Sequence, residues 1–157
     1  MIDRVDHERW MRAALAEGRK AYEKNEVPVG AVIVYEQDII GRGHNLVETL
    51  QDPIAHAELL AITAAANVLA SWRLTDCILY VTLEPCMMCA GAILFSRVSK
   101  VVYGTPDPRY GAAGSKLQLL NNPDLDVRTR VIGGILQQEC SGLIKDFFQK
   151  VRQRLEC

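Results

Sequence analysis

The sequence predicts a three-layer α/β/α fold, with helices on both faces of a mixed central sheet of about five strands. Two observations predict this class. Residues 29–45 read as two strands around a polar turn, which is typical of a hairpin. From residue 53 onward, strand-like runs alternate with helical runs. At 157 residues the chain can bury a substantial core without disulfides, so we expect a single domain over residues 1–157.

The first half of the chain supplies a helix, the hairpin and a second helix. Met11, Leu15 and Tyr22 fall on one stripe of a charged segment, which predicts an amphipathic helix. Asp52 followed by Pro53 is typical of a cap and a first helical turn. The expected elements are a helix at 6–24, strands at 29–35 and 39–45, and a helix from 52–53 to about 70.

The second half continues the alternation of strands and helices. Pro85 is placed to open a helix, and the Gly- and Pro-bearing stretch after Tyr103 predicts a long loop that carries function. The expected elements are a strand at 77–83, a helix from 85 to about 95, a strand at 98–103, a loop at 104–115, a short helix at 116–120, a strand at 127–132 and a helix at 135–155.

Composition excludes several classes of protein. Eighteen Lys and Arg against 19 Asp and Glu give a net charge of −1, so any contact with nucleic acid must be local. No apolar run approaches the roughly 18 residues of a membrane span, and the N-terminus is charged. Five irregularly spaced cysteines suit reduced thiols better than a disulfide framework. We therefore expect a cytoplasmic protein that does not bind membranes.

Glu58 is the one charged residue between Pro53 and Trp72. A helix that is apolar all round should be buried, and a lone buried carboxylate costs several kcal/mol unless something compensates it. His56 lies two positions earlier, so in mid-helix the two side chains would diverge by about 200°. At a helix N-terminus both can reach one point beyond the helix, which indicates a shared ligand. For these residues alone, a core histidine beside a partly solvated glutamate is the simpler interpretation.

Cys86 and Cys89 change that interpretation. They lie three apart at the start of a proline-initiated helix, which puts both sulfurs on one face. A helix N-terminus favours the thiolate form that binds metals. One imidazole and two thiolates leave the fourth position of a tetrahedral Zn²⁺ site for water, which is typical of catalytic sites. Zinc would lower the pKa of that water from 15.7 to roughly 7, and Glu58 would move its proton.

Two other interpretations of the thiols stay open. A Cys-x-x-Cys pair can be a redox centre, although this would leave His56 and Glu58 unexplained. A structural zinc site completed by Cys77 or Cys140 is the other possibility, since structural sites usually have four protein ligands.

His-x-Glu followed by Pro-Cys-x-x-Cys resembles the signature of the zinc-dependent cytidine/deoxycytidylate deaminase superfamily. The chain is similar, over nearly its whole length, to the bacterial tRNA-specific adenosine deaminases within it. The segments that carry this likeness are 25–31, 52–58, 80–92, 96–98 and 111–115. The resemblance implies a cytidine-deaminase-like fold and a homodimer with one Zn²⁺ per subunit. It also implies deamination of adenosine to inosine at the wobble position (34) of a tRNA anticodon, by attack of a zinc-activated water on C6.

The resemblance also implies roles for individual residues. His56, Cys86 and Cys89 would hold zinc, and Glu58 would be the catalytic proton shuttle.

Four further positions would bind the anticodon stem-loop, and each has a simpler structural interpretation. Asn45 would hydrogen-bond the flipped base, or it caps a turn. Val29 would line the pocket, or it belongs to the core. Asp107 would accept from a ribose 2′-OH, or it is a solvated loop charge. Phe148 would stack on a base, or its helix only docks on the domain.

Two rival functions remain open at the level of sequence. A free-base guanine or cytosine deaminase would share the zinc motifs and differ in the pocket walls. A noncatalytic RNA-binding subunit with structural zinc would typically lack the shuttle carboxylate, which is present here as Glu58.

Overall fold

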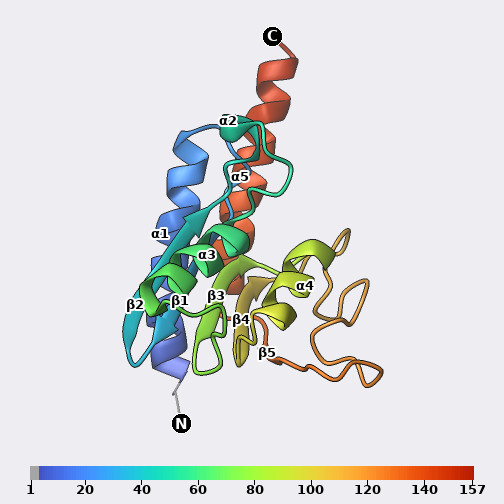
Figure 1. Cartoon of the computed structure of the whole chain (residues 1–157). Helices are drawn as coiled ribbons and strands as arrows, with labels where there is room; N and C mark the ends of the chain where they lie inside the picture. The colour runs from blue at the N-terminus through green and yellow to red at the C-terminus, as the bar shows by residue number, and fades with distance from the viewer. Residues whose placement is uncertain (1–3) are drawn as a thin grey trace.

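The computed structural model describes residues 4–157 and contains a five-stranded sheet between two layers of helices (Figure 1). The elements in chain order are α1 (Arg4–Glu23), β1 (Gly30–Tyr35), β2 (Asp38–His44), α2 (Val47–Leu50), α3 (Ala57–Leu69), β3 (Ile78–Leu83), α4 (Met87–Phe95), β4 (Lys100–Thr105), β5 (Arg130–Ile132) and α5 (Gln137–Leu155).

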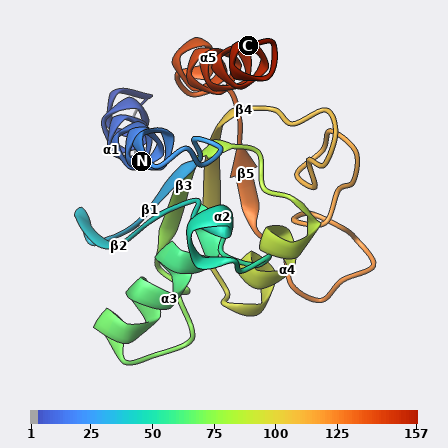
Figure 2. The ribbon, with the colours of Figure 1, turned by 90° about the horizontal axis from the view of Figure 1, so that it is seen from above.

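The strand order is β2-β1-β3-β4-β5. β1 is antiparallel to both β2 and β3, whereas β3, β4 and β5 are mutually parallel, so the sheet is mixed. Viewed from above, α1 and α5 cover one face and α3 and α4 cover the other (Figure 2). The predicted three-layer class and its five strands are confirmed.

Each face of the sheet has its own apolar core. On the α1 and α5 side, Trp10, Met11 and Leu15 pack against Val32, Tyr80 and Val102. On the α3 and α4 side, alanines of α3 and Ile93 of α4 pack against Ile33, Leu79 and Val101. Because β1, β3 and β4 are covered on both faces, their sequences are almost continuously apolar.

The start predicted for the second helix is wrong. Asp52 and Pro53 form a turn, in which Asp52 Oδ1 accepts the amide of Ile54 at 3.0 Å. The helix α3 begins at Ala57, with His56 as its N-cap residue. Aspartate favours both helix caps and turns of this kind, so the local signal does not distinguish them. The four-residue helix α2 was not predicted.

The apolar sequence of α3 predicts a helix that is buried on all sides. This prediction is wrong, because one face of α3 is exposed. Only Ala57, Glu58, Ala61 and Ala65 are buried, and Val68 is 64% exposed. The alanine face packs directly on β2, where a Cβ on Gly43 would lie 2.3 Å from the Ala57 carbonyl oxygen. Small residues on both elements therefore bring α3 close to the sheet, while its other face remains in solvent.

The predicted helix at 116–120 and most of the predicted strand at 127–132 are also wrong. Residues 111–119 fold back on themselves, with Ala113 bridged to Gln118 and the Leu119 amide bonded to the Ala112 carbonyl. Only Arg130–Ile132 join the sheet. Within residues 4–157, the helices do not combine the length and apolarity that a membrane crossing needs.

Candidate active site

His56 and Cys86 occupy equivalent positions on two different helices. Each is the N-cap residue of its helix, His56 of α3 and Cys86 of α4, and each has an extended backbone. Glu58 and Cys89 follow within the first turns of the same helices. The expectation that these side chains converge beyond helix N-termini is confirmed.

The three atoms that could bind a metal are close enough for one ion. His56 Nδ1 lies 3.6 Å from Cys86 Sγ and 3.5 Å from Cys89 Sγ, and all three ligand atoms lie within 4.8 Å of one another. Tetrahedral zinc with bonds of about 2.0 Å to nitrogen and 2.3 Å to sulfur separates its ligands by roughly 3.5 Å. The distances and the donor types therefore fit zinc. Cys77 and Cys140 are buried and do not belong to this cluster of the described chain.

The electrostatics of the cluster favour one thiolate. Hydrogen bonds from the Cys89 thiol and from His56 lower the pKa of Cys86 to about 4. The same contacts raise the pKa of Cys89, aided by burial, and the hydrogen bond to Cys86 raises the pKa of His56. A thiolate is the form of cysteine that ligates a metal, so this cluster already holds one ligand in the required state.

Glu58 is buried, with 4% of its surface exposed. Burial raises its pKa to about 7, although a backbone hydrogen bond opposes this shift. A carboxyl group with a pKa near neutrality can both release and accept a proton under physiological conditions. Glu58 interacts with His56, Cys86 and Cys89, so it lies beside the three side chains that could bind a metal.

A cavity of about 740 Å³ brings the predicted site residues together. Its lining includes His56, Glu58, Cys86, Val29, Asn45, Asp107 and Phe148. Cys89 is fully buried behind this surface and contacts the site through its sulfur. Residues from six parts of the chain therefore meet in one place.

Asn45 and Asp107 both make local backbone contacts as well as lining the cavity. The Asn45 side chain donates to the Val27 carbonyl at 3.3 Å and accepts from the Val47 amide at 3.3 Å. Asp107 Oδ1 accepts from the amides of Arg109 and Tyr110 at 2.9 and 3.2 Å. The interpretation of Asn45 as a residue that caps a turn is confirmed.

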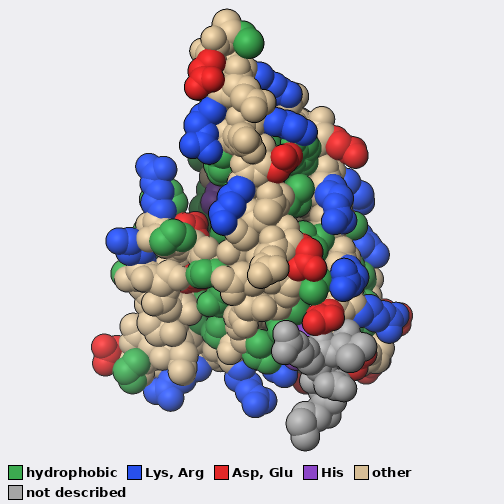
Figure 3. Space-filling view, turned by 180° about the vertical axis from the view of Figure 1, so that it is seen from behind, with side chains coloured by type: hydrophobic (Ala, Val, Ile, Leu, Met, Phe, Trp, Pro, Cys, Tyr) green, Lys and Arg blue, Asp and Glu red, His purple; other side chains and the backbone are tan. Residues whose placement is uncertain are grey.

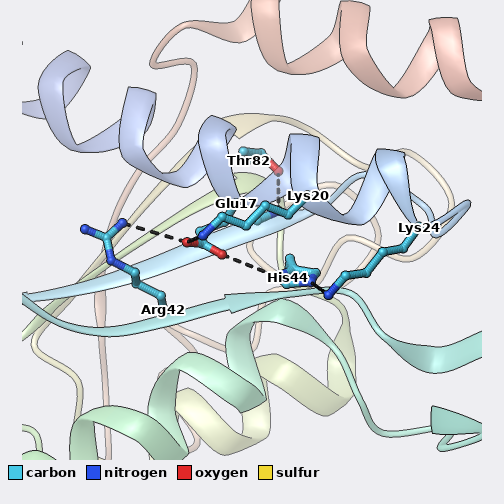
Figure 4. Close-up of polar contacts among 7 residues, drawn as sticks. Glu17, Lys20, Lys24, Arg42, His44 and Thr82 are labelled. Carbon is cyan, nitrogen blue, oxygen red and sulfur yellow. Dashed lines mark hydrogen bonds and ion pairs between the residues drawn. The ribbon is translucent and has the colours of Figure 1, made fainter. Parts of the chain in front are cut away.

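A polar network joins α1 to β2 (Figure 4). The buried Glu17 carboxylate accepts from Lys20 at 2.8 Å and lies 3.3 Å from His44 Nδ1. His44 Nε2 lies 2.9 Å from Lys24 Nζ. His44 immediately precedes Asn45, so this network fixes the strand end from which Asn45 reaches the cavity.

Sequence reasoning missed three residues of this site. Tyr110 lines the cavity and is 49% exposed, with the Arg109 guanidinium 5.0 Å from its ring centre. Glu26 and Glu84 are buried carboxylates next to the cavity; Glu26 accepts backbone amides of α2, and Glu84 accepts backbone amides of the loop that contains Asp107. The partners of both glutamates lie more than twenty residues away in the sequence, so no local signal could have found them.

The chain resembles known deaminases in sequence and in structure. The MafB19-like deaminase family matches residues 5–152. A tRNA-specific adenosine deaminase of Bacillus subtilis (strain 168) is 48% identical, over 94% of this chain and 91% of its own length. A structure from studies of A-to-I editing by tRNA:A34 deaminases superposes with a TM-score of 0.83 and 40% identity, covering 86% of this chain and 98% of that one.

A guanine deaminase of Bacillus subtilis is also similar, with 42% identity and a TM-score of 0.61, over 64% of each chain. This match covers less of the chain than that of the adenosine deaminase relative, which spans nearly all of it. The chain belongs to the MafB19-like deaminases and, within them, to the family of tRNA-specific adenosine deaminases.

Proposed function

We propose that this protein is a zinc-dependent hydrolase that deaminates adenosine to inosine at the wobble position of a tRNA anticodon. One observation carries the chemistry: a buried carboxyl group with a pKa near neutrality lies beside a His-Cys-Cys cluster in an open cavity. The tRNA substrate is supported by relatives that are named tRNA-specific adenosine deaminases.

His56, Cys86 and Cys89 would hold one zinc ion per subunit. Bound zinc supplies Lewis-acid chemistry that makes a water molecule nucleophilic near neutral pH. Three protein ligands leave a coordination position open, which suits a catalytic rather than a structural role.

Glu58 would carry the protons of the reaction. Hydrolysis joins the water oxygen to C6 of adenine and breaks the bond between C6 and the amino nitrogen, which leaves as ammonia. One proton must reach N1 and another must reach the departing nitrogen. The protonated Glu58 donates to N1, and its carboxylate then takes a proton from the water and delivers it to the leaving group. The second proton of the water returns to Glu58 as the C6 carbonyl forms, which restores the protonated carboxyl group.

The other cavity residues would bind the substrate. The Asn45 amide can both donate and accept, which suits a purine edge, and Val29 offers an apolar wall. Asp107 has one carboxylate oxygen that accepts backbone amides, which leaves the other for a ribose 2′-OH. Phe148 is 44% exposed at the cavity and would stack on an anticodon base.

The α5 helix would contact the anticodon stem-loop. Figure 3 shows Lys and Arg side chains around its projecting end. Lys145, Lys150, Arg152 and Arg154 are exposed there, although the protein as a whole has a charge of −1. A local cationic surface of this kind predicts a modest dependence of binding on salt. The tRNA substrate favours a cytoplasmic location.

The protein would act as a homodimer, as its family resemblance implies. The outer face of α4 offers a surface for a second copy, because Met87 and Phe95 are 53% and 77% exposed and lie eight residues apart on one stripe. Exposed apolar side chains gathered on one helix face are typical of an interaction site.

The direct test incubates protein loaded with one equivalent of zinc with unmodified tRNA that carries adenosine at the wobble position. We expect inosine in the tRNA and no deamination of free guanine or cytosine. Glu58→Ala should keep zinc and lose turnover, whereas Glu139→Gln, an exposed change on α5, should keep both. Deamination of guanine alone would refute the tRNA assignment, and substantial turnover by Glu58→Ala would refute the proton shuttle.

A further inference from the structure

Glu84 is a buried carboxylate that the proposed mechanism does not use. It lies between β3 and Pro85, and only 1% of its surface is exposed. Its own amide donates to the Thr105 carbonyl at 2.9 Å, which ties it to the end of β4. A buried ionised group must be compensated by hydrogen-bond donors, so its partners show what it does for the structure.

Within residues 4–157, the hydrogen-bond partners of this carboxylate all come from one loop. Oε1 accepts from the Asp107 amide at 3.1 Å and from the Ser115 hydroxyl. Oε2 accepts from the amides of Ala113 and Ser115 at 3.0 and 3.1 Å. Hydrogen bonds to a charged acceptor are stronger than neutral ones, so Glu84 holds both ends of the 107–115 loop.

The loop is shaped to fit this carboxylate. A Cβ on Gly111 would lie 2.3 Å from Glu84 Oε2 and 2.5 Å from the Asp107 carbonyl oxygen, so only glycine fits there. The Ala112 amide also donates to the Pro85 carbonyl at 2.8 Å. The loop is thereby fastened to the residues that lead directly into Cys86.

The same loop forms one wall of the cavity. Asp107, Arg109 and Tyr110 line it, and the Asp107 carboxylate holds the amides of the other two. The metal and proton groups would come from α3 and α4 instead, although Cys86, at the start of α4, also pairs with Gly111 of the loop. Release of the loop would therefore disturb contacts to the substrate before it disturbs the chemistry.

We propose that Glu84 is a positioning residue of the deamination reaction, which fixes the 107–115 wall against the bound nucleotides. This inference rests on the proposed function. A purely structural role would reduce the folded fraction, and so the apparent kcat, at an unchanged KM. A positioning role raises KM for the anticodon stem-loop while kcat changes little.

The first measurement follows the loop itself and needs no activity. Trypsin cleaves after Arg109, which is exposed within the loop. Glu84→Gln places an amide N–H₂ against backbone donors, so cleavage after Arg109 should become about tenfold faster in zinc-loaded protein. Glu26→Gln is the matched control, because Glu26 is equally buried but accepts from Glu48 and Thr49 of α2, outside this loop. It should leave this cleavage rate unchanged.

The second measurement compares zinc content, KM and kcat. Glu84→Gln should retain one zinc, raise KM for the stem-loop about tenfold and keep kcat within about threefold. Gly111→Ala, which displaces the loop and keeps Glu84, should give the same pattern. Gly142→Ala on α5, where a Cβ meets nothing within 4 Å, should have no effect.

Loss of zinc, an unchanged KM, or unchanged cleavage after Arg109 in Glu84→Gln would overturn the positioning role. If wild-type protein forms no inosine, the proposed function fails separately. In that case the cleavage rate and the affinity for the stem-loop still decide whether Glu84 holds the wall.

Discussion

Metal-free wild-type protein should become less stable as the pH rises, because of Glu58. Replacement of Glu58 by glutamine should remove this loss of stability. Burial raises the pKa of Glu58 from its ordinary value of 4.5 to about 7. Below pH 4.5 the carboxyl is protonated in both the folded and the unfolded chain. Between the two values the unfolded chain releases the proton and the folded protein retains it, so a rise in pH favours unfolding.

The size of this effect follows from the two pKa values. Each pH unit between them is worth about 1.4 kcal/mol, which gives a total on the order of 3 kcal/mol. A small domain is stabilised by only about 5–15 kcal/mol, so the difference is readily measured. Wild-type protein should lose this amount relative to Glu58→Gln between pH 4.5 and 7, and the difference should stay constant at higher pH.

The assay is urea denaturation of chelator-treated protein at a series of pH values from 4 to 8. Glu139→Gln is the control, since Glu139 is exposed on α5. A difference between wild type and Glu58→Gln that does not vary with pH would refute the reasoning, because it would mean that burial does not disfavour the ionised form of Glu58.

Three further outcomes are expected. In chelator-treated protein at pH 6, iodoacetamide should alkylate Cys86, whose pKa is lowered to about 4, and added zinc should suppress this reaction. Cys77, whose pKa burial raises to about 11, should not react with or without zinc. Alkylation of Cys86 at the same rate with and without zinc would contradict the metal site. Thr82→Val should lower the free energy of unfolding by about 1–3 kcal/mol, because the Thr82 hydroxyl accepts a buried β1 amide at 3.1 Å; an unchanged urea midpoint would count against this. If the protein is the proposed homodimer, Phe95→Glu should give a monomer in light scattering, whereas Leu155→Glu, equally exposed at the far end of α5, should not; a dimeric Phe95→Glu would exclude the α4 face as the interface.

The His-Cys-Cys cluster was predictable because its signal is local. The i to i+2 spacing of His56 and Glu58 makes chemical sense only at a helix end, and the i to i+3 spacing of the cysteines places both sulfurs on one face. The error in the start of α3 did not affect this prediction. His56 still lies at a helix N-terminus, which is closer to the helix end than the sequence indicated.

The walls of the cavity were much less predictable. Asn45, Asp107 and Phe148 entered through family resemblance, and nothing in their local sequence distinguishes a base contact from a capped turn or a docking helix. The helix expected at 116–120 is wrong for a related reason. Those residues satisfy their backbone groups by pairing with 111–114 and not with one another.

By itself, the sequence determined which side chains can do chemistry and that each belongs to a helix end, because periodicity and spacing are properties of neighbouring residues. Only the tertiary structure decided that α3 and α4 point their N-termini at the same place, that Glu58 is buried enough to raise its pKa, and that Glu84 fastens a loop more than twenty residues away. Burial and long-range hydrogen bonds depend on which elements pack together. The packing of elements depends on the order of all strands in the sheet, which no single segment of the sequence specifies.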